Sequence, residues 1–117
     1  MVNKKGCRFD CKMSDGVMNI VLDGEIDHHS AVSVRSAIDA KIYEQRPKSL
    51  IMDLSKIDFM DSSGLGLIMG RYALMQKLGG DFCISEPAER VLKIFELAGL
   101  GRIIKIKSEK GDNKNEK

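Results

Sequence analysis

The chain has 117 residues, enough for one domain with a buried core but too few for separate cofactor and substrate domains. Hydrophobic residues make up 43% and charged residues 31%, a composition typical of a folded globular domain that excludes a disordered chain. The net charge is only +2, whereas a nucleic-acid-binding protein would concentrate basic residues on one face. We therefore expect one small site or one binding surface, with no nucleic-acid partner.

Hydrophobic periodicity and turn residues predict alternating strands and helices. The first half of the chain is predicted to form strands at 7–13 and 17–22, a helix capped by Asp27 or Ser30 that ends near Gln45, and a strand at 49–54. We then predict a loop at 55–61 and a helix that ends at Gly79-Gly80. The last predicted elements are a strand at 82–84, a helix opened by Pro87 and a strand at 102–106. The expected inner faces of the three helices are Ala31, Val34, Ile38 and Ile42, then Leu65, Ile68, Met69, Tyr72 and Met75, and finally Val91, Leu92, Phe95 and Ala98.

This β-β-α-β-α-β-α-β order predicts an α/β fold. Strand-helix-strand units give a largely parallel sheet, and the opening hairpin around Ser14-Asp15-Gly16 makes the sheet mixed. The apolar run 49–54 suits a central strand covered on both faces. Residues 1–107 are expected to form the domain and residues 108–117, which are rich in Lys, Glu, Asp and Asn, a disordered charged tail.

Two features of the sequence indicate where in the cell the protein is found: its three cysteines and the lack of a long apolar segment. Cys7, Cys11 and Cys83 have no metal-like spacing and are expected to be reduced and buried. No stretch reaches the roughly 18 apolar residues of a membrane span, and the first residues run into polar sequence, so we expect no signal peptide. We expect a soluble, cytoplasmic protein with no membrane partner and no metal.

Two polar loops follow neighbouring strands, at the strand ends where functional loops gather in such sheets. The first is Gly24-Glu25-Ile26-Asp27-His28-His29, and the second is Asp58-Phe59-Met60-Asp61-Ser62-Ser63-Gly64-Leu65-Gly66. One helix cap is needed, yet Asp61, Ser62 and Ser63 can each supply it, so at least one serine hydroxyl should face solvent. Gly64 and Gly66 each weaken a helix by roughly 1 kcal/mol, which indicates close approach of another chain or a neighbouring element.

Other kinds of site fit this region less well. The Gly64-x-Gly66-x-x-x-Gly70 spacing is a weak dinucleotide pattern, because its glycines lie inside the helix and nearby aspartates would repel a pyrophosphate. A catalytic serine would need His28 or His29 as its base, but a G-x-S-x-G elbow is absent. Two adjacent histidines diverge on a helix, so they cannot readily share a metal ion.

The second loop resembles the phosphorylation loop of bacterial anti-sigma factor antagonists, which are STAS domains. The likeness rests on Asp61-Ser62-Ser63-Gly64-Leu65-Gly66, with Phe59-Met60 before it and Gly70-Arg71-Tyr72 after it. Gly24-Glu25-Ile26-Asp27-His28-His29 is similar to the other signature loop of that family, and the resemblance extends from about Val17 to Ile106. It implies a STAS-like domain over residues 1–107.

The resemblance also implies a function without catalysis or a cofactor in this chain. In the family, the unphosphorylated antagonist binds an anti-sigma factor that is also a serine kinase, and so frees a sigma factor. The kinase phosphorylates the serine that corresponds to Ser62, and a serine phosphatase reverses the modification. The partner surface would include Asp27, His28, Asp61, Ser62, Ser63, Gly64 and Gly66. The sporulation branch, which controls sigma F, is favoured; a general-stress antagonist or a small nucleotide-binding protein are the alternatives.

Overall fold

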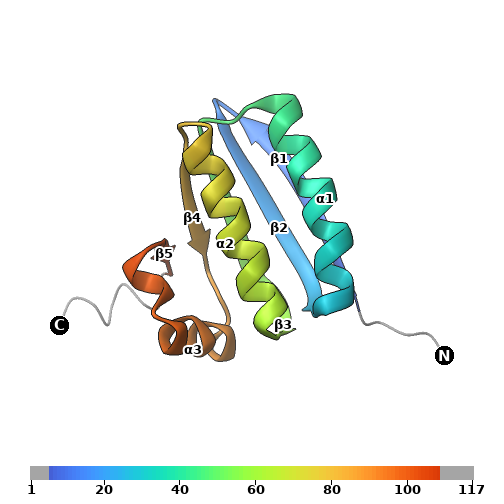
Figure 1. Cartoon of the computed structure of the whole chain (residues 1–117), viewed down its shortest axis with the longest axis vertical. Coiled ribbons are helices and arrows are strands. Elements are labelled where there is room, and N and C mark those ends of the chain that lie inside the picture. Colours follow the sequence, from blue (N-terminus) through green and yellow to red (C-terminus); the bar gives the residue numbers. More distant parts are fainter. Residues whose placement is uncertain (1–5, 109–117) are drawn as a thin grey trace.

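A hairpin followed by alternating helices and strands forms the domain in the computed structural model, which describes residues 6–108 (Figure 1). The elements are β1 (Cys7–Ser14), β2 (Val17–Ile26), α1 (His28–Gln45), β3 (Ser49–Met60), α2 (Ser62–Lys77), β4 (Asp81–Ser85), α3 (Glu89–Ala98), the short 3-10 helix η1 (Leu100–Arg102) and β5 (Lys105–Lys107). The predicted β-β-α-β-α-β-α-β order is confirmed, with η1 added. The predicted tail, apart from Ser108, lies outside the described residues.

The five strands form one mixed sheet in the order β1-β2-β3-β4-β5. β1 is antiparallel to β2, and the other neighbouring pairs are parallel, as the predicted hairpin and crossovers require. Helices α1 and α2 lie side by side across one face of this sheet (Figure 1). The α/β fold class with a mixed sheet is therefore confirmed.

The core lies between the sheet and the helices α1 and α2. Alternate residues of the two central strands are fully buried and level with one another in the register: Met18 and Ile20 of β2 against Leu50 and Met52 of β3. Residues that point to the other face, such as Ile51, are only half-buried. The prediction that the central strand is covered on both faces is wrong, because α1 and α2 both lie on one face.

Both strands that lead to the polar loops are longer than predicted. β2 does not end at Gly24 but continues to Ile26, and the predicted loop 55–61 is mostly strand, because β3 continues to Met60. Gly24 has a φ of +118°, and a Cβ there would collide with the carbonyl oxygen of Gly6. This glycine and two register shifts let the pairing of β2 with β3 continue.

The last part of the chain also differs from the prediction. Ala88 is the N-cap of α3, so Pro87 precedes the helix instead of opening it, and Ala98 is exposed instead of buried. The last strand is not 102–106 but β5, because Leu100 to Arg102 form η1. The predicted core face of α3 is confirmed at Val91 and Phe95, which are fully buried.

The helix faces agree with the predicted periodicity more closely in α1 than in α2. Val34, Ile38 and Ile42 are buried along α1. In α2 the buried face is rotated toward Leu67 and Arg71, while the predicted residues Leu65, Met69 and Tyr72 are partly buried against the core. All three cysteines are free thiols, but only Cys83 is buried; Cys7 and Cys11 are half-buried.

Candidate functional site

Asp27 forms the start of α1. Its Oδ1 accepts a hydrogen bond of 2.9 Å from the backbone N–H of Ser30, and the Ser30 hydroxyl accepts one of 3.0 Å from the N–H of Asp27. The two residues thus cap the helix reciprocally, so both predicted capping residues take part. The hydrogen bonds that the Asp27 carboxylate accepts, chiefly the one from the Ser30 N–H and then one of 3.1 Å from the Ser30 hydroxyl, lower the pKa of that carboxyl. Asp27 is therefore an anion held at a positive helix terminus.

Asp61 has the same role at the start of α2. Its Oδ1 accepts a hydrogen bond of 2.8 Å from the N–H of Ser63, so Asp61, and neither serine, is the N-cap. Ser62 is the first residue of α2 and is exposed, and its hydroxyl has no hydrogen-bond partner among residues 6–108. The prediction that a serine hydroxyl faces solvent is confirmed, and the hydroxyl is that of Ser62.

The strand register brings the two caps together. Ile26 and Met60 are paired neighbours at the ends of β2 and β3, and the N–H of Asp61 donates to the carbonyl of Ile26 at 3.2 Å. Asp27 and Asp61 therefore follow adjacent parallel strands, which are roughly 4.8 Å apart in a sheet. The site is a shared end of the sheet at which two helices begin, each capped by an aspartate.

The two glycines of the second loop have different surroundings. Gly64 is buried, and a Cβ there would lie 2.7 Å from the Sδ of Met60 and 2.9 Å from its Cβ. The close approach predicted for Gly64 thus comes from a neighbouring element of the same chain. Gly66 is exposed, and a Cβ there would meet nothing within 4 Å. Packing within residues 6–108 therefore does not require a glycine at position 66.

The histidines lie beside these caps but form no catalytic arrangement with the serines. His28 and His29 are the first two residues of α1 and are exposed. His28 and Ser63 line the same groove between α1 and α2, yet the described part of the chain has no hydrogen bond between them. The Asp61 carboxylate also occupies an N–H at the start of α2 that a bound phosphate would need. These observations give no support to a hydrolase or a dinucleotide site.

An ion pair between α1 and α2 was missed from the sequence. The Arg71 Nε lies 2.9 Å from Oδ1 of Asp39, and Nη2 donates to Oδ2 at 3.3 Å. The Nη1 group also donates to the carbonyl of Leu67 at 3.2 Å. Burial lowers the pKa of the Arg71 guanidinium, and the Asp39 carboxylate acts in the opposite direction. The pair fixes one helix of the site against the other.

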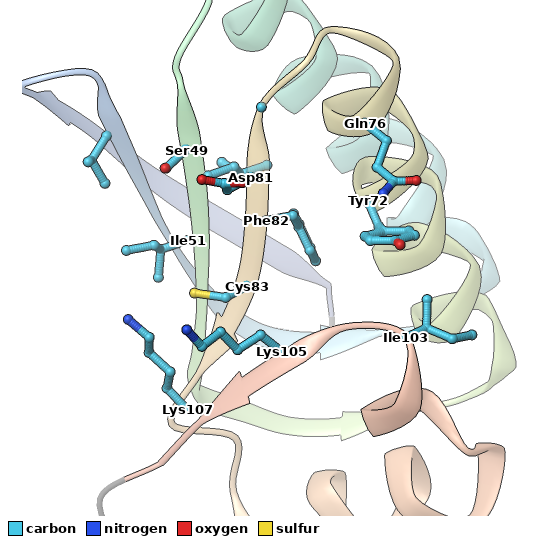
Figure 2. Close-up of a pocket in the computed structure, with 13 residues that line it drawn as sticks. Ser49, Ile51, Tyr72, Gln76, Asp81, Phe82, Cys83, Ile103, Lys105 and Lys107 are labelled. Carbon is cyan, nitrogen blue, oxygen red and sulfur yellow. The ribbon is translucent and has the colours of Figure 1, made fainter.

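Another cavity lies away from these helix starts. It has a volume of about 620 Å³ and wraps the edge of β4 where β5 does not cover it (Figure 2). Ser49 and Asp81 of its lining begin β3 and β4, so the cavity is near the amino ends of these strands, whereas Asp27 and Asp61 follow carboxyl ends. Ligand sites of open parallel sheets lie at the carboxyl ends, so we place the functional site at the helix caps.

Two further findings concern ions and membranes. Within residues 6–108, no group of three or more His, Cys, Asp or Glu side chains is arranged to hold a metal ion. None of the helices in the same range is long and apolar enough to cross a membrane.

Comparisons with known proteins agree with this geometry. A family model described as the STAS domain matches residues 8–113. An anti-sigma F factor antagonist of Paenibacillus polymyxa is 36% identical over 91 residues, which cover 78% of each chain. An anti-sigma-B factor antagonist of Bacillus subtilis is 34% identical over 104 residues, covering 87% of this chain and 94% of that protein.

Solved structures of the anti-sigma factor antagonist SpoIIAA are also similar. The structure of its unphosphorylated form matches with a TM-score of 0.74 at 29% sequence identity. The match covers 92% of this chain and 95% of the SpoIIAA chain. Its phosphorylated form, from Bacillus, has a TM-score of 0.68 at 28% identity and covers 94% of this chain and 100% of its own. By its sequence, its fold and the length matched, this chain belongs to the STAS domain family.

Proposed function

We propose that this chain is an anti-sigma factor antagonist that is switched off by phosphorylation of Ser62. In its unphosphorylated form it binds an anti-sigma factor with serine kinase activity, and the sigma factor is released. The partner surface is formed by the two helix starts: Asp27, His28, Asp61, Ser62, Ser63, Gly64 and Gly66. The observation that carries the proposal is the Ser62 hydroxyl, which is exposed at the start of α2 and has no hydrogen-bond partner among residues 6–108. The chain itself is a ligand and a substrate and not an enzyme.

The choice of Ser62 over Ser63 is supported by their positions. Ser63 is half-buried, lines the groove between α1 and α2, and gives its N–H to the Asp61 carboxylate. Ser62 precedes it at the exposed tip of the helix. A kinase can reach the Ser62 hydroxyl without moving either helix, so no change of fold is needed before modification.

Electrostatics provide a mechanism for the switch. A phosphate on Ser62 would add about −1.5 to −2 charges at neutral pH. This phosphate is held covalently and does not need the N–H of Ser63 that Asp61 occupies, and the positive end of α2 offsets part of its charge, so the backbone need not change. Asp27 and Asp61 are next to it, and exposed Asp58 lies three residues before Asp61. A partner surface that accepts the neutral hydroxyl would instead meet concentrated negative charge, and a loss of ~1.4 kcal/mol already weakens binding tenfold.

The pathway is proposed from the relatives. The anti-sigma F antagonist of Paenibacillus polymyxa favours the sporulation sigma factor, sigma F, and the anti-sigma-B antagonist of Bacillus subtilis represents the general-stress alternative. A phosphatase specific for phosphorylated Ser62 would restore binding. The free thiols of Cys7, Cys11 and Cys83 are consistent with the cytoplasm as the place of action.

Phosphorylation of purified protein tests this function. The wild-type chain, Ser62→Ala and Ser63→Ala are each incubated with an anti-sigma F kinase and labelled ATP, and the phosphorylated residue is mapped by mass spectrometry. We expect label on Ser62 in the wild type and in Ser63→Ala, and none in Ser62→Ala. Label retained by Ser62→Ala would move the site to another residue, and an unlabelled wild-type chain would contradict the proposal.

A further inference from the structure

A groove between α1 and α2 opens next to the helix starts. Its volume is about 260 Å³, and it is lined by Val32 and Arg35 of α1 and by Ser63 and Gly66 of α2, with His28 beside the Asp27 cap. Drug-sized ligands usually occupy pockets of roughly 300–1,000 Å³. The groove is therefore small for a nucleotide, and its size suits one or two side chains of another protein.

The groove has features that the fold of residues 6–108 does not require. Val32 is one of the few large apolar side chains that remain exposed, at 47%. Gly66 weakens α2, although a Cβ would meet nothing within 4 Å. The absence of a side chain at position 66 keeps the groove open from the α2 side. An apolar wall and a gap maintained by glycine together indicate that an apolar group enters from outside.

Side chains of opposite charge lie at the two ends of the groove. Asp27 and Asp61 lie at the helix starts, and Arg35 lies eight residues after Asp27, or about 12 Å further along α1. Arg35 is exposed and forms no ion pair within residues 6–108; the neighbouring carboxylate of Asp39 is taken by Arg71. Along α1, the surface is therefore acidic at the helix start, apolar at Val32 and basic at Arg35.

We propose that this α1–α2 groove binds an apolar side chain of the anti-sigma factor, and that a carboxylate of the same partner forms an ion pair with Arg35. The inference rests on the proposed function and extends the partner surface beyond the two loops to Val32 and Arg35. The partner is expected to have the inverse order of groups: a cation facing Asp27 and Asp61, then the apolar side chain, then the carboxylate. Phosphorylation of Ser62 would act at one end of this surface and leave the groove itself unchanged.

Substitution of Gly66 gives the sharpest test, because folding and binding should change in opposite directions. A side chain at position 66 would improve α2 but fill the groove, so Gly66→Ala is expected to raise the melting temperature, and Gly66→Leu to weaken binding roughly tenfold or more. Gly70 is the matched control: it also lies in α2 with open space around its Cβ direction, but it does not line the groove. Gly70→Leu should bind as the wild type does.

The other two groups are tested in pairs. Val32→Ala is compared with Tyr43→Ala, which removes a side chain of similar exposure, 48%, at the far end of α1. Arg35→Glu is compared with Lys12→Glu, a reversal of an exposed charge on β1. We expect each groove variant to weaken binding roughly tenfold, and the controls to leave it unchanged.

Binding is measured by calorimetry with a purified anti-sigma F factor and ADP, so that Ser62 stays unmodified. Tight binding of the wild type with unchanged affinity of Gly66→Leu, Val32→Ala and Arg35→Glu would overturn the groove proposal and remove Gly66 from the proposed partner surface, while the proposed binding of the anti-sigma factor and the phosphorylation of Ser62 would stand. A wild-type chain that does not bind would contradict the proposed function itself. Weakened binding in the groove variants alone supports both.

Discussion

Arg71 of α2 and Asp39 of α1 form an ion pair with 2.9 Å between Nε and Oδ1, while the Arg71 side chain is only 7% exposed. This contact joins the two helices whose amino ends form the candidate site. The Asp39 side chain is 30% exposed and can reach water, whereas the Arg71 guanidinium is enclosed. The pair is therefore asymmetric, and loss of the carboxylate should matter more than loss of the arginine.

This asymmetry predicts different costs for substituting the two partners. Asp39→Ala leaves a buried unpaired cation and should lower the free energy of unfolding by about 3 kcal/mol. Arg71→Met removes the charge but fills much of the space, so its cost should be smaller. Urea unfolding of the two variants checks the order. Equal stabilities, or a larger loss in Arg71→Met, would contradict the assignment of Arg71 as the group that depends on its partner.

Gly64 and Gly70 should respond to alanine with opposite signs. At position 64 the new methyl group would overlap Met60, including its Cβ, so Gly64→Ala should destabilise the fold by about 1–3 kcal/mol. At position 70 nothing lies within 4 Å, so Gly70→Ala should stabilise α2 by about 0.5–1 kcal/mol. Thermal and urea unfolding measure both effects. A neutral Gly64→Ala would show that Met60 can move away.

The cap formed by Asp27 should make stability depend on pH in the acid range. Hydrogen bonds from Ser30 lower the pKa of Asp27 below its ordinary value of 3.8. The ionised carboxylate therefore makes its full contribution to the free energy of unfolding above pH 3.8. The contribution is lost as the pH falls through the lower pKa of the folded protein. Asp27→Asn keeps a capping oxygen without the charge and should flatten this part of the stability curve.

Urea midpoints between pH 7 and the acid limit compare the wild type with Asp27→Asn. Asp15→Asn, at the exposed hairpin turn, is the control that removes the same charge without a helix cap. If the acid dependence is the same in Asp27→Asn and in the wild type, another group is responsible for it.

The sequence predicted the elements and the meeting of the two loops because those features are local. Capping residues, turn glycines and apolar periodicity are visible within a few positions, and parallel strands must end at one edge of the sheet. The strand extensions to Ile26 and Met60 could not be predicted, since they depend on a bulge at Gly24 beside the backbone of Gly6. The ion pair of Arg71 was not predictable either, because its partner Asp39 lies 32 residues earlier on another helix.

The sequence alone left open which residue of the second loop caps its helix. The row Asp61-Ser62-Ser63 offered three capping groups, and only the fold identifies Asp61 as the cap and leaves Ser62 exposed. The groove residues Val32 and Arg35 lie in an ordinary helical stretch with no distinguishing pattern. The exposed helical glycine at position 66 was the one sequence signal that pointed toward that groove.

If a charge on Ser62 alone separates this chain from its partner, a titration of the unmodified and the phosphorylated chain should show it. The dissociation constant for an anti-sigma F factor with ADP is measured for the unmodified chain and for the chain phosphorylated on Ser62, with circular dichroism of each. Binding should be at least roughly tenfold weaker after phosphorylation, with unchanged spectra. Equal dissociation constants, or a loss of binding that accompanies unfolding, would contradict it.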